Sequence, residues 1–390
     1  MKFLFIIKSF AQVAGVERVM CDKMNYLENQ GHTVRLLTYE QGSHPLVFEL
    51  APKIKHVDID CRFFKLHTLP VIKRLYANFQ MKRTFKQRLS KILSDFDPDA
   101  IISPTYPLDI VSEMICTKGR AKLILESHMA YIQALKTYNK QRSLIGRIAA
   151  KIYDWHALHL LKKCDCMVVL THGDYSFWSQ HVKNVKVLPN PLTYYPENID
   201  DVKKDSNRII SIGRLTAIKR FDLLIEAFVL AYKKNSNWHL DIFGDGSDRG
   251  ILTDKIKALG MEGKVIIHPT TSNIYTEIKR SQILAMTSES EGFPLVLIEA
   301  LACGVPCISF DCPYGPGEII ENNKSGLLVE NGNVESFAQK LTILMSSPDT
   351  IRAMSTYAHK VTEQYKKDLV IRKWEQLYLN EIRRTKSSET

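Results

Sequence analysis

The chain has 390 residues, more than one domain of ordinary size holds, so we expect two domains. Hydrophobic residues make up 45% of the sequence and charged residues 24%, a balance that fits a soluble globular protein. The net charge is +11, and the excess lies in residues 1–190, which suggests an anionic partner for that half or a solvated basic face with no partner.

The first half alternates short apolar runs with helical patterns. Residues 1–8 are too short a run for a secretory signal peptide and are better explained as a buried first strand. A helix with apolar residues at helical spacing follows and ends at Gly31. Later strands are expected at 34–39, 100–103, 123–126, 166–170 and 185–188, with long helical patterns at 68–95 and 142–163. This alternation predicts a parallel sheet covered on both faces.

The second half repeats the alternation after a break at 189–207, where three prolines precede a polar cluster. Strands are expected at 208–213, 238–243, 264–268, 282–286 and 306–310. We therefore expect an α/β fold of two Rossmann-like, doubly wound domains that face each other across a cleft. The expected domains are 1–190 and 208–365, joined by a linker at 191–207. A C-terminal helical segment at 366–390 could cross back to the first domain or pack on the second.

In open α/β sheets, ligands bind beyond the carboxyl ends of the strands, so the residues after each strand are candidate site residues. The strongest motif reads EGFPLVLIE over 291–299 and follows the strand at 282–286. Gly292 lets the backbone approach a ligand closely, and Pro294 suits the first turn of a helix. The amides of that turn, around Phe293, Leu295 and Val296, form an anion site.

Two carboxylates bracket this motif, Glu291 before the helix and Glu299 within it. Glu299 lies among apolar residues, where a carboxylate needs hydrogen-bond donors, and ribose hydroxyls would supply them. The alternative is that Glu291 is a helix-start acid and Glu299 faces solvent.

The strand at 208–213 leads into a second candidate site. Arg214 follows its end, and Lys219 opens the next helix. Two cations at one strand-to-helix loop suit a pyrophosphate, although both could simply face solvent. Gly244 lies in a third turn, FGDGSD at 243–248, which lacks the last glycine of the dinucleotide-binding fingerprint.

The first half offers two further candidates. Gly15 opens the helix after the first strand and could lie against a phosphate or a sugar, or could be part of an ordinary turn. His128 follows the strand at 123–126, where it could donate a hydrogen bond or move a proton, or could be a structural or solvated histidine.

No metal site is expected. The pairs Asp58 with Asp60 and Asp97 with Asp99 have the spacing of a metal-sugar-phosphate site, but the second pair lies at the wrong end of its strand. The first pair has no second acidic cluster near it. The eight cysteines include no Cys-x-x-Cys pair, so we expect reduced thiols in a cytoplasmic protein.

Taken together, these motifs resemble glycosyltransferase family 4. The resemblance is carried by Gly213-Arg214-Leu215 with Lys219, by 243–246, by 291–299, by ALACGVP at 300–306 and by LPNP at 188–191. The stretch FDCPYGPGEII at 310–320 looks like a subgroup that includes galactosyltransferases of bacterial exopolysaccharide assembly. One departure is Ala14, where the family often has a second glycine before Gly15.

The resemblance implies two GT-B domains, an acceptor-binding first domain and a nucleotide-sugar-binding second domain. It implies a retaining transfer of a hexose from a UDP-sugar, with no bound metal and no cofactor. Glu291 would contact the sugar hydroxyls, Glu299 the ribose, and Arg214 and Lys219 the diphosphate. His128 would face the donor sugar. The acceptor would be a saccharide or lipid-linked saccharide in cell-surface polysaccharide synthesis.

An anionic membrane surface is a further expected partner, at the inner face of the cell membrane. The segment 53–91 holds 11 Lys and Arg against only Asp58 and Asp60, and a basic and apolar patch includes Arg142, Arg147 and Trp155. The patch could equally belong to a helix packed on the first sheet. Two alternatives to a transferase stay open: a UDP-sugar epimerase or hydrolase on the same scaffold, and a basic nucleic-acid-binding protein. No nucleic-acid partner is expected under the transferase hypothesis.

Overall fold

The chain forms two compact units, residues Met1–Pro189 with Val370–Thr390 and residues Asn190–Leu369. The computed structural model describes residues 1–11, 15–105, 108–130, 151–152, 155, 158–205 and 207–386. Each unit is built on one parallel sheet with helices on both faces, which confirms the predicted class of two doubly wound α/β domains.

The first unit contains a seven-stranded sheet in the order β3-β2-β1-β4-β5-β6-β7. All of its strand pairs are parallel. The strands are β1 (Lys2–Ile7), β2 (Thr33–Thr38), β3 (Lys55–Asp58), β4 (Ala100–Pro104), β5 (Lys122–Ser127), β6 (Cys166–Val169) and β7 (Val185–Val187). The helices are α1 (Gly15–Asn29), α2 (Val71–Phe96), α3 (Leu108–Thr117), α6 (His172–Trp178) and α14 (Lys367–Lys386), with a 3-10 turn at Phe63–Thr68.

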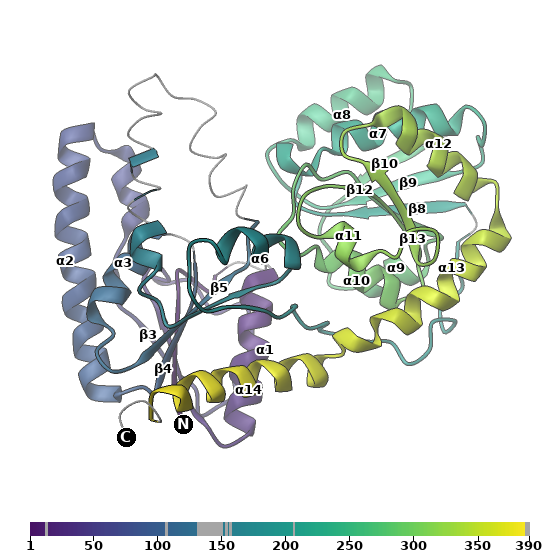
Figure 1. Ribbon diagram of the computed structural model, residues 1–390. Helices are drawn as coiled ribbons and strands as arrows, with labels where there is room; N and C mark the ends of the chain where they lie inside the picture. Colours follow the sequence, from purple (N-terminus) through teal and green to yellow (C-terminus); the bar gives the residue numbers. More distant parts are fainter. Residues whose placement is uncertain are drawn as a thin grey trace. The chain divides into compact units, whose positions relative to one another are not determined.

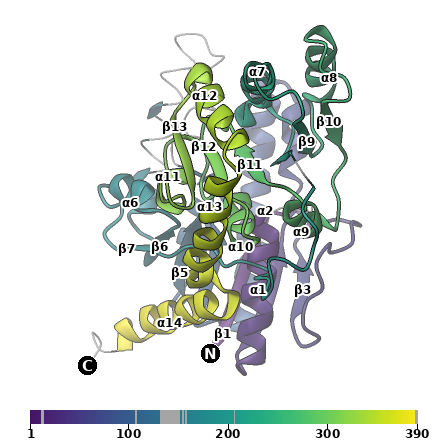
Figure 2. The same ribbon diagram turned by 90° about the vertical axis from the view of Figure 1, so that its right-hand side faces the viewer.

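Alternate residues of β1 pack on opposite faces of this sheet. Leu4 and Ile6 belong to a core with α2 and α3, as Phe85 and Val111 illustrate. Phe3 points the other way, and its ring lies 5.9 Å from that of Tyr378 on α14. Figures 1 and 2 show α1 and α14 on this second face. The C-terminal helix is therefore part of the first unit.

The second unit contains a six-stranded parallel sheet in the order β10-β9-β8-β11-β12-β13. Its strands are β8 (Arg208–Ile212), β9 (His239–Phe243), β10 (Val265–His268), β11 (Ile283–Met286), β12 (Cys307–Asp311) and β13 (Gly326–Glu330). Its helices are α7 (Phe221–Tyr232), α8 (Arg249–Ala258), α9 (Ile274–Lys279), α10 (Leu295–Ala302), α11 (Pro316–Ile319), α12 (Val334–Met345) and α13 (Pro348–Val361), with 3-10 turns at Ala217–Lys219 and Thr362–Tyr365.

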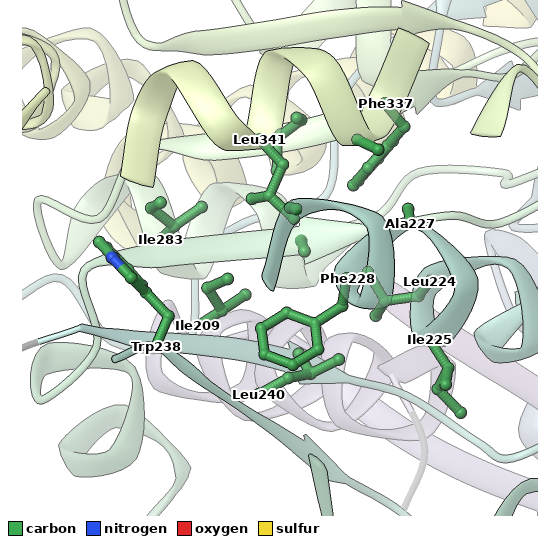
Figure 3. Packing of buried hydrophobic residues seen from close by; sticks show 14 of the residues in the cluster. Ile209, Leu224, Ile225, Ala227, Phe228, Trp238, Leu240, Ile283, Phe337 and Leu341 are labelled. Atoms are coloured by element: carbon green, nitrogen blue, oxygen red, sulfur yellow. The ribbon is translucent and has the colours of Figure 1, made fainter. Parts of the chain in front are cut away.

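One face of the second sheet forms a core with α7 and α12. Figure 3 shows Phe228 of α7 and Leu341 of α12 directed toward the strand residues Ile209 and Leu240. The opposite face packs on α10, where Leu297 and Ile298 are fully buried. Both faces are apolar, so every strand needs a helix on each side, as the continuous apolar runs of the sequence predict.

Two regions differ from the expectations. Residues 191–207 were expected as a linker, but the described residues among them pack on the second unit: Leu192 is buried in its core, and Lys279 Nζ pairs with Asp201 at 2.8 Å. The edge strands β3 and β13 did not stand out in the sequence. The helical pattern at 142–163, with Arg142 and Arg147, lies mostly outside the described residues.

Candidate functional site

The order of strands in the second sheet brings the two strongest sequence motifs together. β8 and β11 are neighbours, although β9 and β10 lie between them in the sequence. The chain leaves β8 toward β9 on one side and leaves β11 toward β12 on the other. Ligands of open α/β sheets bind where the strand order reverses in this way, beyond the carboxyl ends of the strands. Arg214 and Lys219 follow β8, and 291–299 follows β11.

Direct contacts join these two loops. Lys219 Nζ lies 2.6 Å from Glu291 Oε1, and both side chains are largely buried. The amide of Glu289 donates to the carbonyl of Ile218 at 2.8 Å, and Thr287 Oγ1 donates to the carbonyl of Arg220 at 2.9 Å. The Lys219 ammonium is thus held beside a carboxylate by loops that are fixed to each other at three points.

Arg214 supplies the uncompensated charge of this site. Its side chain is exposed, and it has no ion-pair partner among the residues that the structure describes. Leu215, next to it, is fully buried and bonded through its amide to the carbonyl of Asp245, which fixes the backbone that carries the guanidinium. A fixed backbone with a free guanidinium is suited to an anionic ligand.

The helix after β11 begins as the motif predicts. Pro294 is the N-cap of α10, and Leu295 and Val296 form its first turn, whose amides lack intrahelical acceptors. Ser288, in the same loop, has a buried hydroxyl without a hydrogen-bond partner among the described residues. Glu299 is half-buried and accepts a hydrogen bond from Tyr275 Oη at 3.1 Å. Glu299 therefore does not simply face solvent.

Two glycines allow the loops to approach each other. A Cβ on Gly244 would lie 1.9 Å from the carbonyl oxygen of Gly213, so the turn after β9 can touch the turn after β8 only with glycine here. A Cβ on Gly315 would lie 2.7 Å from Pro294 Cδ. Gly244 was expected at a ligand, and the structure gives it a packing role between the two turns.

The candidates of the first half lie in the first unit. Gly15 is the first residue of α1, and residues 12–14, including Ala14, lie outside the described residues. His128 directly follows β5, and its Nε2 lies 2.9 Å from Glu126 Oε2. Burial lowers the pKa of His128 below its ordinary value, against the opposing effect of Glu126. The imidazole is therefore neutral near pH 7.

The aspartate pairs have structural partners. Asp58 accepts hydrogen bonds from the amide of Gly42 at 3.0 Å and from Thr38 at 3.1 Å, and Asp60 pairs with Arg62. Asp97 pairs with Arg120, and Asp99 accepts from the amide of Lys2 at 2.8 Å. None of the described helices is long and apolar enough to cross a membrane.

Three residues of the site were missed in the sequence: Tyr275, Ser288 and Gly315. Tyr275 lies on α9, which follows β10, so the rule that residues after a strand are site candidates could have identified it. Ser288 follows β11 directly and was passed over in favour of the motif behind it. Gly315 lies within 310–320, to which no site residue was assigned.

Two family models match the chain in succession. The model described as Glycosyltransferase Family 4 matches residues 13–193, and the model described as Glycosyl transferases group 1 matches residues 197–361. The two matched ranges together span most of both units.

Individual proteins are similar over nearly the whole chain. The amylovoran biosynthesis glycosyltransferase AmsD of Erwinia amylovora is 27% identical, over 96% of this chain and 98% of its own length. A Campylobacter jejuni enzyme that is named as an α-1,4-N-acetyl-D-galactosaminyltransferase acting on a diphospho-undecaprenol-linked saccharide is 24% identical, over 96% and 97%. The structure of S. aureus TarM with Fondaparinux, α-GlcNAc-glycerol and UDP superposes with a TM-score of 0.75 at 17% identity, over 97% of this chain and 100% of that one.

Proposed function

The chain belongs to glycosyltransferase family 4, with the GT-B fold and a part in polysaccharide biosynthesis, and we propose that it transfers a hexose from a UDP-sugar with retention of anomeric configuration and without a metal ion. We propose a galactose-type sugar, on the resemblance of 310–320. One observation carries the proposal: Lys219 and Glu291 meet at 2.6 Å where the strand order reverses.

The charges of this site match a nucleoside diphosphate sugar. Arg214 and Lys219 are cations on one loop, and the first turn of α10 directs amides to the same end of the sheet. A diphosphate gains charge as the sugar departs, so fixed cations stabilise the transition state more than the ground state. TarM, which shares the fold, was crystallised with UDP.

The two carboxylates would contact the parts of the donor other than the diphosphate, namely the hexose and the ribose. Glu291 pairs with Lys219, the residue proposed to bind the diphosphate, so its carboxylate would lie near the donor's hexose hydroxyls. Glu299 lies about one turn into α10, with one oxygen bonded to Tyr275. We propose that Glu291 binds the hexose hydroxyls, that Glu299 binds the ribose, and that His128 of the first unit contacts the donor sugar.

The chemistry follows from these groups. The bond between the anomeric carbon and the diphosphate oxygen breaks, and the electron pair leaves with the diphosphate. The acceptor hydroxyl attacks the oxocarbenium-like carbon on the face that the diphosphate leaves, and its proton passes to the departing phosphate oxygen. Retention follows because attack and departure use the same face.

A lipid-linked saccharide acceptor is supported by the surface of α2. Leu75, Tyr76 and Phe79 are between 64% and 68% exposed, although they are large and apolar. The exposed cations Lys73 and Arg83 flank them, and α2 carries no acidic residue before Asp95. An apolar strip flanked by cations fits an anionic lipid surface, at about 1 kcal/mol for each cation near the lipid. We propose that α2 docks on the cytoplasmic face of the membrane.

Flotation with vesicles tests this docking. The protein should float with vesicles that contain an anionic phospholipid and not with purely zwitterionic ones. The triple variant Leu75→Ser, Tyr76→Ser, Phe79→Ser should lose flotation, whereas the control Ile251→Ser, at an exposed site on α8, should keep it. Equal flotation of the triple variant, or salt-sensitive binding to RNA in place of vesicles, would count against the proposal.

A donor panel tests the transferase itself. The protein is incubated with UDP-sugars, with EDTA, and with or without lipid-linked saccharides from a polysaccharide-producing bacterium. Acceptor-dependent release of UDP and a product with the donor's anomeric configuration are expected. Acceptor-independent release of free sugar, or conversion of one UDP-sugar into another, would instead identify the hydrolase or the epimerase.

A further inference from the structure

A charged pair is enclosed inside the first unit. Lys23 of α1 and Glu126 of β5 are fully buried, and Lys23 Nζ lies 2.7 Å from Glu126 Oε2. Burial lowers the pKa of Lys23 to about 8, while Glu126 acts to raise it. Burial alone would raise the pKa of Glu126, but Lys23 and His128 outweigh it and lower that pKa to about 2. Both partners are therefore charged at neutral pH.

The C-terminal helix completes this cluster. Tyr378 of α14 donates its hydroxyl proton to Glu126 Oε1 at 2.5 Å, across 252 positions of sequence. The ring of Trp374, one turn earlier, lies with its centroid 3.0 Å from Lys23 Nζ. Lys23 and Tyr378 therefore hold the carboxylate at its two oxygens, and both come from helices on the same face of the sheet.

His128 is the third group bonded to Glu126. A carboxylate only accepts hydrogen bonds, so the contact of 2.9 Å requires that His128 Nε2 carries a proton. In the neutral imidazole, Nδ1 is then an acceptor. Nδ1 is buried and has no hydrogen-bond partner among the described residues. A buried acceptor of this kind needs a donor, and His128 lies at the end of β5, the edge of the sheet where ligands bind.

A role in stability alone explains this cluster poorly. Buried ion pairs generally add little stability compared with apolar residues of the same size. Three side chains, from α1, from α14 and from the residue after β5, converge here on one carboxylate, and one of the three is His128.

We propose that Glu126, held by Lys23 and Tyr378, is a positioning residue that fixes His128 with Nε2 protonated, so that Nδ1 accepts a hydrogen bond from a hydroxyl of the donor sugar. This inference rests on the proposed function, in which His128 contacts that sugar. The C-terminal helix then has a part in the transfer, because Tyr378 acts on the sugar-binding histidine through Glu126.

The test uses Tyr378→Phe in the full-length protein, which removes one hydroxyl and keeps the ring. Turnover of the UDP-sugar that is active in the donor panel should fall by about tenfold, with UDP affinity unchanged because UDP binds the second unit. Tyr357→Phe is the matched control, since Tyr357 also donates to a glutamate, Glu321, at 2.6 Å, and its turnover should stay at the wild-type level.

Two further readouts separate positioning from a loss of structure. Loss of the Tyr378 bond makes Glu126 more basic, which raises the pKa of His128, so the acid limb of the turnover profile should move to higher pH. In a His128→Ala background, Tyr378→Phe should cause no further loss, because its effect passes through His128. The double variant Lys23→Met, Glu126→Gln, which leaves no unpaired buried charge, should also lower turnover with UDP binding intact.

Unchanged turnover and pH profile in Tyr378→Phe, or additive losses with His128→Ala, would overturn the inference and leave the transferase proposal standing. If His128→Ala itself keeps full turnover, the proposed contact of His128 with the sugar fails, and this inference fails with it. If the wild-type protein does not bind UDP, the proposed donor site of the second unit is wrong.

Discussion

Lys219 Nζ lies 2.6 Å from Glu291 Oε1, and this pair ties the loop after β8 to the loop after β11. In the absence of donor, each group neutralises the other. Under the proposed function, a bound diphosphate would compete with Glu291 for the lysine, and the carboxylate would be released toward the sugar.

Substitution of each partner should have opposite effects on the affinity for UDP. Glu291→Gln removes the competing carboxylate, so UDP should bind as tightly as to wild type or more tightly, while sugar transfer falls. Lys219→Met should weaken UDP binding by about tenfold or more, the typical value of one charge-assisted hydrogen bond. Fluorescence competition with UDP measures both. Weaker UDP binding in Glu291→Gln would show that the carboxylate serves the nucleotide.

The proposed ribose contact predicts discrimination among nucleotides. Wild-type protein should bind UDP about tenfold or more tightly than 2′,3′-dideoxy-UDP, because the loss of the hydroxyls leaves Glu299 without these donors. Glu299→Ala should bind the two nucleotides equally. The same competition assay measures both affinities. A preference for UDP that persists in Glu299→Ala would show that another residue binds the ribose.

Gly244 and Gly250 give a matched pair for stability. Gly244→Ala would place a Cβ 1.9 Å from the carbonyl oxygen of Gly213, and we expect a loss of unfolding free energy of about 2 kcal/mol or more. Nothing lies within 4 Å of a Cβ on Gly250, which is on α8, so Gly250→Ala should stabilise by about 0.5–1 kcal/mol. Urea unfolding of both variants checks this, and similar midpoints would contradict it.

The buried carboxylate of the first unit should make stability depend on pH. Burial opposes ionisation of Glu126, but Lys23 and His128 lower its pKa to about 2 from 4.5. Between about pH 2 and pH 4.5, Glu126 therefore stays ionised in the folded protein, whereas the same carboxyl group is protonated in the unfolded chain. This stabilisation is complete above about pH 4.5 and is lost as the pH falls toward 2, with about 2 kcal/mol lost by pH 3.

The matched comparison is the double variant Lys23→Met, Glu126→Gln. Between pH 5 and 3 its unfolding free energy should fall by less than that of wild type, since the titrating group is gone. Parallel pH dependence of the two proteins would show that Glu126 does not titrate as described.

Local patterns were sufficient for the fold class and for the loops of the candidate site. Strands such as β1 and β11 are continuous apolar runs, and Arg214 and Glu291 could be placed because each follows such a run. The edge strand β3, with Lys55, His56 and Asp58, is only half-buried and lacks that pattern. An edge strand has one neighbour and therefore a weaker apolar signal.

The pairings inside the site could not be predicted in the same way. Lys219 meets Glu291 because β8 and β11 are adjacent, and the order of strands in space is not encoded in any one segment. Tyr275 with Glu299, and Tyr378 with Glu126, likewise depend on which helices cover which face. His128 was singled out by its place after a strand, but its partners were found only in the structure.

Calorimetric titration of UDP into the purified protein with EDTA, repeated on Arg214→Ala and on the control Arg249→Ala, tests the central claim most directly. Arg249 is the first residue of α8, and one of its guanidinium nitrogens lies 3.8 Å from Asp245. The account predicts that UDP binds wild type and Arg249→Ala alike, and binds Arg214→Ala at least about tenfold more weakly. Absence of UDP binding by wild type, or equal binding by Arg214→Ala, would contradict a diphosphate site on the loops after β8 and β11.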